Sequence, residues 1–240
     1  MSLSRATTMS RGTFKNRITV AALVGLLVGL LLTLVQQFQV MPLLLEAEQY
    51  EQAAAHQLSA EHDHATTDHR NEHGGWQPSE GWERTLFTAG ANIVVAFGFT
   101  LFLGALVTLR NANLTWRSGL LWGLGGYAVF FVAPSLGLPP ELPGTESAAL
   151  MARQLWWGGT VIATASALWL LVFSPRAAFK ILAVVVLIAP HLIGAPQPDI
   201  HVSTAPAELA HTFVVATAIA NALFWLGLGA LYGLFQKWVD

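Results

Sequence analysis

The sequence predicts an all-α integral membrane protein with six transmembrane helices, paired as three outward hairpins with both termini in the cytoplasm. Of its 240 residues, 54% are hydrophobic and only 11% are charged, whereas a soluble domain usually carries about 25% charged residues. The mean hydropathy is +0.52. Six apolar runs approach or exceed the roughly 20 residues that a helix needs to cross a hydrocarbon core. None of the runs alternates apolar and polar residues, so membrane strands are not expected.

The six runs give the expected spans of a single membrane domain that covers residues 1–240. These spans are 18–35, 86–109, 118–138, 155–173, 177–194 and 212–235. The first apolar run is longer than the core of a usual signal peptide and lacks a clean cleavage site after it, so we expect it to be retained. Residues 46–85 are predicted to form an acidic, histidine-rich extracytoplasmic loop.

The distribution of charge sets the expected orientation, because Lys and Arg concentrate on the cytoplasmic side of membrane proteins. With the N-terminus inside, nine of the twelve Lys and Arg residues fall on the cytoplasmic side. Thirteen of the fourteen acidic residues fall outside. All eight histidines are then placed outside or at outer helix ends.

An internal repeat is suggested by residues 133–153 and 189–211, which can be laid over each other. Both begin with Ala-Pro, continue through a Gly- and Pro-containing loop, and end in the next helix. Parallel repeats of this kind occur in transporters, with sites at the repeat interfaces. The alternative is that any outer hairpin collects Pro and Gly.

A short tract of imidazoles and carboxylates lies in the expected outer loop. Each of its four histidines follows an Asp or Glu directly, and His56 precedes the tract; the four are His62, His64, His69 and His73. Nitrogen and carboxylate oxygen donors together suit ions such as Co²⁺, Ni²⁺ and Zn²⁺. The irregular spacing predicts a flexible capture tract, and the alternative is a solvated acidic loop in which histidine is incidental.

Further candidate metal ligands flank the outer helix ends. Glu48 and Glu51 would share one helix face at a spacing of three residues. The remaining candidates are Glu141, His191, Asp199, His201, Glu208 and His211. Glu208 and His211 could face one ligand from the start of the sixth span, or all of these residues could simply anchor helix ends at the interface.

Uncharged polar residues inside the spans are candidates for an ion pathway. They are Asn92, Gln154, Thr160 and Asn221. The alternative is that they form hydrogen bonds between neighbouring helices. No span centre carries an ionisable residue, so a proton relay is not supported. The chain has no cysteine and no nucleotide-binding or hydrolase motif, so we do not expect an enzyme.

Several stretches resemble the CbtA-type family of predicted cobalt transporter subunits over nearly the whole chain. The most specific is GLPPELPGTESAALMARQLWW at 137–157, and AEQYE at 47–51, APHLIGAPQP at 189–198 and PAELAHTF at 206–213 support it. The resemblance implies a bacterial inner-membrane protein that takes up cobalt for cobalamin biosynthesis with a small single-span CbtB-like subunit. The family stretches contain Glu48, Glu51, Pro140, Glu141, Arg153, Gln154, Trp156, Trp157, His191, Pro196 and Pro198.

We therefore expect a multi-pass membrane subunit of a Co²⁺ uptake transporter. Outer His, Asp and Glu residues would capture the cation and pass it between helices, with Ni²⁺ or Zn²⁺ as alternative cargo and no permanently bound cofactor. The second hypothesis is a non-transporting metal-binding, sensing or assembly subunit of a permease. A third is a membrane enzyme with an outer metal centre, which would need a fixed site with an open coordination position. Lipid surrounds the chain in each case; a homo-oligomer is an option, and no nucleic-acid partner is expected.

Overall fold

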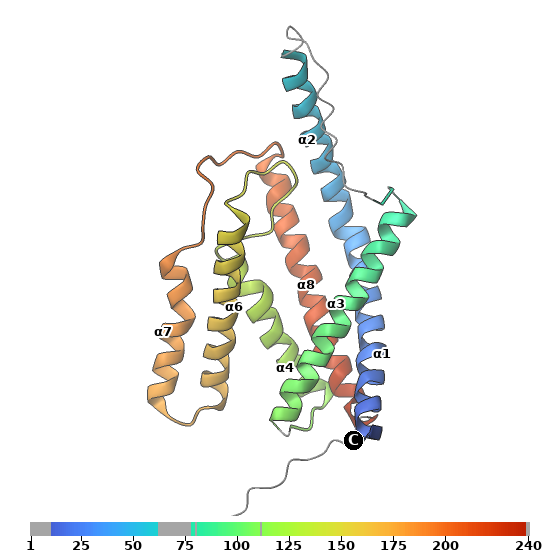
Figure 1. The fold of residues 1–240 in the computed structure, drawn as a ribbon, viewed down its shortest axis with the longest axis vertical. Coiled ribbons are helices and arrows are strands. Elements are labelled where there is room, and N and C mark those ends of the chain that lie inside the picture. Colours follow the sequence, from blue (N-terminus) through green and yellow to red (C-terminus); the bar gives the residue numbers. More distant parts are fainter. Residues whose placement is uncertain (1–10, 62–77, 80, 111, 239–240) are drawn as a thin grey trace, which may run out of the picture. The chain divides into compact units, whose positions relative to one another are not determined.

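The computed structural model describes residues 11–61, 78–79, 81–110 and 112–238, and the regular structure of these residues is entirely helical (Figure 1). Five helices in this part of the chain are long and apolar enough to cross a membrane. A sixth apolar helix, α7 (Ala177–Ile193), has 17 residues. The prediction of an all-α multi-pass membrane protein is confirmed, whereas the outward hairpins and the cytoplasmic termini stay predictions.

The first helix is much longer than the predicted span. It runs without a break through α1 (Arg11–Val35), the π-helical turn η1 (Gln36–Val40) and α2 (Met41–Glu61). The first part of the expected outer loop, from residue 46 onward, is therefore helical. Residues 46–61 are rich in Ala, Glu and Gln, all strong helix formers, and contain neither Gly nor Pro. The predicted span ended too early because it was drawn from hydropathy, which falls where the polar residues begin although the helix continues.

Two π-helical turns share the same local cause. The turn η1 directly precedes Met41-Pro42, and the second turn, η2 (Ala128–Val132), directly precedes Ala133-Pro134. Proline has no N–H to offer to a carbonyl four residues back, and its ring crowds that carbonyl. In both places the preceding helix widens instead, since Met41 donates to the carbonyl of Gln36 and Ala133 donates to that of Ala128. Such π-bulges let a helix continue past a disruption.

Three helices, α3 (Trp82–Leu109), α6 (Leu150–Phe173) and α8 (Ala207–Phe235), begin about a turn earlier than the predicted spans, because their first turns carry polar residues that a hydropathy window leaves out. Helix α4 (Trp116–Tyr127) begins two residues earlier than predicted, and α7 begins at residue 177 as predicted. The short α5 (Ala133–Ser135) follows η2, and the 3₁₀ turn η3 (Gln236–Trp238) follows α8.

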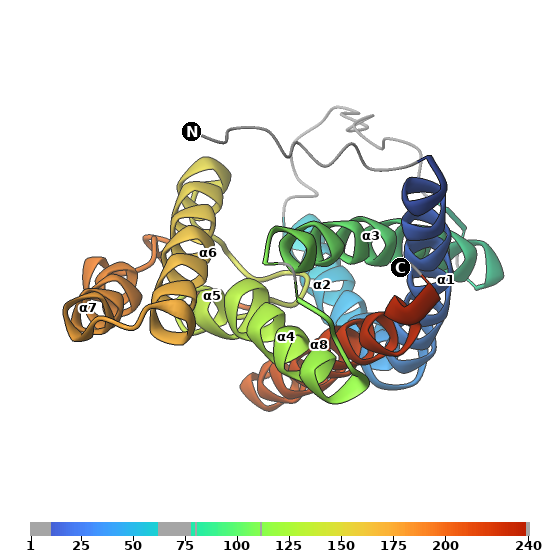
Figure 2. The ribbon, with the colours of Figure 1, turned by 90° about the horizontal axis from the view of Figure 1, so that it is seen from below.

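Internal contacts divide the chain into two units. The first comprises Met1–Thr33, Leu86–Leu124 and Leu223–Asp240. Its core contains Val24 and Val28 of α1, Thr100 of α3 and Leu228 of α8, all fully buried. Helices α4 and α8 lie side by side in this unit (Figure 2), and glycines let their backbones touch: a Cβ on Gly119 would lie 2.1 Å from the carbonyl oxygen of Gly229. Small residues at such crossings are typical of membrane helices.

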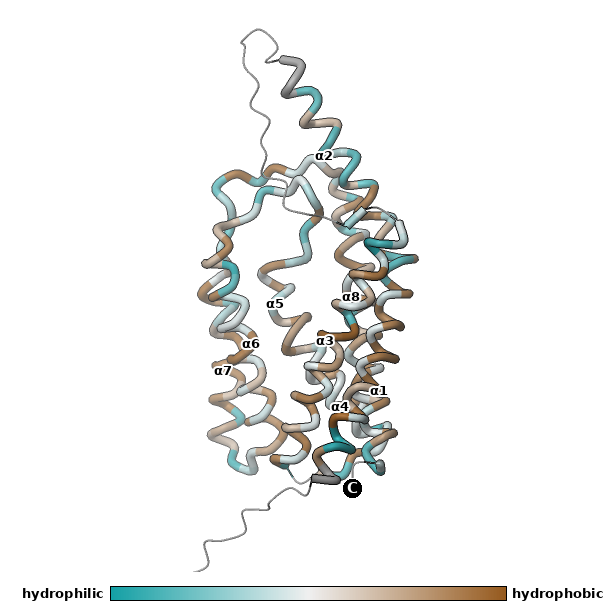
Figure 3. Tube along the Cα trace, turned by 45° about the vertical axis from the view of Figure 1, so that its right-hand side comes forward, coloured by the Kyte–Doolittle hydropathy of each residue, from teal (hydrophilic) through white to brown (hydrophobic). Residues whose placement is uncertain are grey.

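The second unit comprises Leu34–Thr85 and Gly125–Ala222. In it α6 and α7 pack against each other along their length (Figures 1 and 2). Many of their large apolar side chains are exposed, such as Ile162, Ile181 and Val185. Figure 3 shows this hydrophobic character along both helices, with polar residues near the helix ends. Apolar helix surfaces of this kind suit contact with lipid, because all backbone hydrogen bonds are satisfied within the helix.

The two long loops of the second unit are joined by backbone hydrogen bonds. The N–H of Glu146 donates to the carbonyl of Val202 at 3.0 Å, and that of Thr204 donates to the carbonyl of Gly144 at 3.2 Å. Gly144 has a φ of +74°, a left-handed conformation that costs other residues energy. A Cβ there would also lie 2.1 Å from the Thr204 hydroxyl. The join therefore needs glycine, and it fixes the residues that surround the site described next.

Candidate functional site

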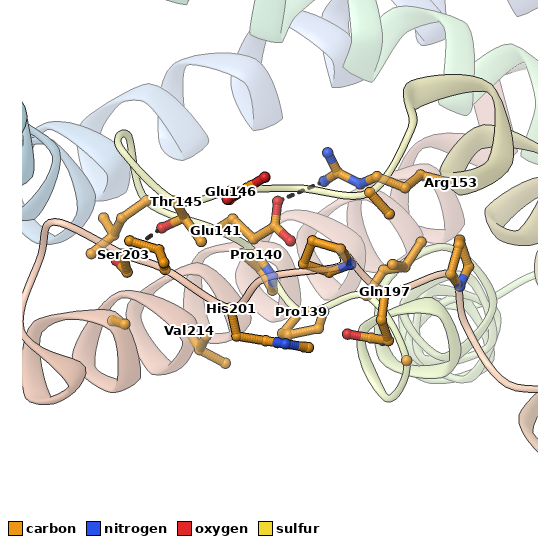
Figure 4. Close-up of a pocket in the computed structure, with 18 of the residues that line it drawn as sticks. Pro139, Pro140, Glu141, Thr145, Glu146, Arg153, Gln197, His201, Ser203 and Val214 are labelled. Atoms are coloured by element: carbon orange, nitrogen blue, oxygen red, sulfur yellow. Dashed lines mark hydrogen bonds and ion pairs between the residues drawn. The ribbon is translucent and has the colours of Figure 1, made fainter.

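A cavity of about 380 Å³ lies between the two joined loops. We call it the loop cavity; its walls come from residues 137–153, from residues 196–203 and from the start of α8 (Figure 4). Four prolines line it, Pro139, Pro140, Pro196 and Pro198, and they stiffen the backbone there. Its charged and titratable side chains are Glu141, Glu146, Arg153, His201 and His211.

An ion pair crosses the upper wall of the loop cavity. Arg153, in the first turn of α6, donates from Nη2 to Oε2 of Glu141 at 2.8 Å (Figure 4). The hydroxyl of Ser147 donates to the same oxygen. About a quarter of each charged side chain is exposed, 29% for Arg153 and 26% for Glu141. The carboxylate of Glu141 is therefore already paired with the guanidinium of Arg153.

The two histidines of the loop cavity come from different elements. His201 lies in the loop after α7, and His211 lies near the start of α8; both are exposed. Two imidazoles and two glutamates thus line one cavity. They are not close enough to form a finished site, because no group of three or more His, Asp or Glu in the described residues is placed to hold a metal ion. A cation bound there would need a rearrangement that brings a carboxylate toward the imidazoles.

The carboxylates of α2 are placed differently. Glu48 and Glu51 do lie three residues apart on a helix, as the sequence indicated. Glu48, however, accepts two hydrogen bonds from Arg84 of α3, at 2.7 and 3.4 Å, one to each oxygen. Glu51 and His56 are exposed on α2, and the four histidines of the tract lie outside the described residues.

The other predicted ligands line neither this cavity nor the groove described next. Asp199 is exposed in the loop, and Glu208 is exposed in the first turn of α8. His191 is in the last turn of α7, half-buried, with its ring edge-on to Trp156 at 6.0 Å between centroids. The indole N–H of Trp156 in turn donates to the carbonyl of Pro190. His191 therefore has a packing role in the present arrangement.

A second hollow, of about 730 Å³, runs between η2–α5 and the first turns of α6. We call it the helix groove; aromatic rings of Phe130, Phe131 and Trp157 line it, and its polar side chains from α6 are Arg153 and Gln154. Of the four predicted pathway residues, Gln154 alone lines either hollow.

The remaining pathway residues make hydrogen bonds. The amide of Asn92 donates to the hydroxyl of Thr33 at 3.0 Å, which joins α3 to α1. The hydroxyl of buried Thr160 donates to the carbonyl of Trp156, and the amide of Asn221 donates to the carbonyl of Thr217, each within its own helix. Asn92 thus fits the alternative of a bond between helices, whereas Asn221 does not.

Sequence reasoning missed the pairing of Glu141 with Arg153 and the place of Glu146 in the cavity wall. The family stretch had pointed to both members of the pair, but nothing in their spacing of twelve residues predicts contact. The Pro- and Gly-rich composition of the segment was the available signal, because it marked a loop that folds back on itself.

The structure thus defines a multi-pass helical membrane protein whose loops and adjoining helix starts gather histidine, glutamate and arginine around one cavity. The chain belongs to the CbtA family, probable cobalt transporter subunits, because the family model matches residues 14–237. Searches among curated proteins and among solved structures found no match.

Proposed function

We propose that this chain is the membrane subunit of a bacterial Co²⁺ uptake system and that the loop cavity is where the cation first binds. Family membership supports cobalt transport, and the name "subunit" implies a partner. We propose a small single-span CbtB-like protein as that partner and the inner membrane as the location, with the loop cavity on the outer side.

The observation that carries the proposal is the meeting of His201 and His211 in one cavity with two glutamates. Imidazole and carboxylate are ligands that Co²⁺ shares with Ni²⁺ and Zn²⁺. A site with only a few protein ligands suits a transported ion, because the ion must be released again. The acidic, histidine-bearing segment between α2 and α3 raises the local cation concentration, and the cavity then binds the ion.

From the cavity the cation passes along polar side chains of the helices, first Gln154 of the helix groove and then Asn221 of α8. The membrane potential assists this step, since moving two charges through 100 mV is worth about 4.6 kcal/mol.

The test is cell-associated Co²⁺ in a cobalt-uptake-deficient bacterium that expresses the chain with its small partner, after a wash with an impermeant chelator. We expect chelator-resistant cobalt well above the empty-vector level, and a fall of about tenfold or more in H201A/H211A, the loss expected when roughly 1.4 kcal/mol of binding is removed. Parallel assays with Ni²⁺ and Zn²⁺ define selectivity.

H56A is the matched comparison, because His56 is an exposed histidine that lines neither hollow. It should keep most of the uptake. Equal losses in H56A and H201A/H211A would contradict the loop cavity as the binding site, and cobalt that the chelator removes completely would contradict transport.

The second candidate is a non-transporting metal-binding, sensing or assembly subunit. One observation favours it: the polar groups of Asn92, Thr160 and Asn221 are all engaged in hydrogen bonds in this structure. Such a subunit would bind cobalt at the loop cavity but accumulate none inside.

A further inference from the structure

The loop cavity and the helix groove share one wall. Five residues line both hollows: Leu138, Pro139, Pro140, Glu141 and Arg153. All belong to the second unit. The two charged members of this set are the partners of the ion pair, so the boundary between the hollows consists of three apolar residues and one salt bridge.

The ion pair is held by few contacts. Arg153 reaches Glu141 through Nη2 alone, and its Nε is buried without a hydrogen-bond partner among the described residues. On Glu141, Ser147 and Arg153 both bond to Oε2, and within the described part of the chain no hydrogen bond reaches Oε1. One carboxylate oxygen is therefore available to another cation while the pair is closed.

The pair between Glu48 and Arg84 shows the contrast. There two guanidinium nitrogens bond to two carboxylate oxygens, the bidentate arrangement that gives the strongest and most rigid Arg–carboxylate contacts. The single contact between Arg153 and Glu141 is the more easily exchanged of the two. It is also the one that stands between two hollows.

We propose that the Glu141–Arg153 ion pair is a cation-operated gate between the loop cavity and the helix groove. A divalent cation held by His201 and His211 takes Glu141 as a further ligand, Arg153 loses its partner, and the wall opens toward Gln154. This inference rests on the proposed function, because a transported cation is what requires the passage.

The gate can be tested by measuring how fast a water-soluble thiol reagent reaches the groove. The chain contains no cysteine, so a single introduced cysteine is the only thiol that can react. Ser135 lines the helix groove alone and Ser203 lines the loop cavity alone, so S135C and S203C are matched reporters. Each is made in the full chain, in membrane vesicles, and its reaction with a charged, membrane-impermeant methanethiosulfonate is timed without metal.

We expect S135C to react at least about tenfold more slowly than S203C, as for an open state populated at or below about 10%. R153Q should raise the S135C rate toward the S203C rate and leave S203C unchanged. R153K keeps a cation that can make the single contact, so it should remain closed. Size-exclusion chromatography in detergent, with one symmetrical peak, establishes that each variant is folded.

Adding Co²⁺ should accelerate the reaction of S135C, and H211A should abolish that acceleration. Equal rates for S135C and S203C in the parent chain, or no effect of R153Q on S135C, would overturn the gate. The metal-free rates do not depend on transport. If S135C reacts slowly and R153Q accelerates it, but no cobalt is taken up, the proposed function alone is refuted. If cobalt is taken up but S135C reacts as fast as S203C, the gate alone is refuted.

Discussion

At the scale of single residues, the two Glu–Arg pairs show how similar side chains take different roles. Both arginines lie in the first turn of a helix, Arg84 in α3 and Arg153 in α6, and both reach back to a glutamate of an earlier segment. The difference is the number of contacts, two against one. We infer that Glu48 with Arg84 serves mainly stability, so Glu48 is a weaker candidate for a metal ligand than Glu141.

This gives a prediction for stability. R84Q should lower the free energy of unfolding by about 1 kcal/mol, because a charged, bidentate contact is lost from a partly exposed place, and the apparent melting temperature in detergent should fall by about 2–4 °C. The control is K180Q, which removes an exposed cation that forms no ion pair among the described residues. Melting curves that shift equally for R84Q and K180Q would refute the structural role.

At the scale of helices, the close approach of α4 and α8 depends on positions rather than on glycine content. Gly119 and Gly125 both lie in α4, but a Cβ on Gly119 would clash with the backbone of Gly229, whereas one on Gly125 would meet nothing within 4 Å. The sequence shows that glycine is frequent in the spans, and it does not show which glycines touch another helix.

G119A should therefore destabilise the protein by about 1–3 kcal/mol, the usual cost of forcing extra atoms into a packed contact. G125A should be neutral or stabilise by up to about 1 kcal/mol, because alanine is the better helix former. Thermal unfolding of the two variants, purified in the same detergent, compares them directly. Equal melting temperatures would show that the two helices do not pack through Gly119.

Helix boundaries were predicted less well than the helices themselves. The hydropathy pattern located every apolar helix, because a membrane span is defined by the apolar length that lipid requires. It ended the first helix too early and began others too late, since polar turns at helix ends carry no apolar signal. The π-helical turns before Pro42 and Pro134 could have been anticipated as local irregularities from the prolines, although their form could not.

At the scale of the whole molecule, the candidate site was only partly predictable. His201 and His211 lie ten residues apart, and the sequence placed both near one outer helix end. Their cavity needs residue 141 as well, sixty residues earlier, and the contact between the two loops is made largely by backbone hydrogen bonds that leave no side-chain pattern. The order of the helices was readable, but the meeting of the loops was not.

Asn221 offers the clearest test of whether the cation passes along α8. Its amide bonds to a carbonyl of its own helix, so N221L breaks no bond between helices and should leave the melting temperature unchanged. N92L is less informative, because it removes the bond from α3 to α1.

If the cation passes along α8, N221L should reduce chelator-resistant Co²⁺ uptake about tenfold, which corresponds to roughly 1.4 kcal/mol in the barrier. Cobalt held at the loop cavity of the purified protein, measured at equilibrium, should not change. Unchanged uptake in a normally stable N221L protein would remove Asn221 from the pathway.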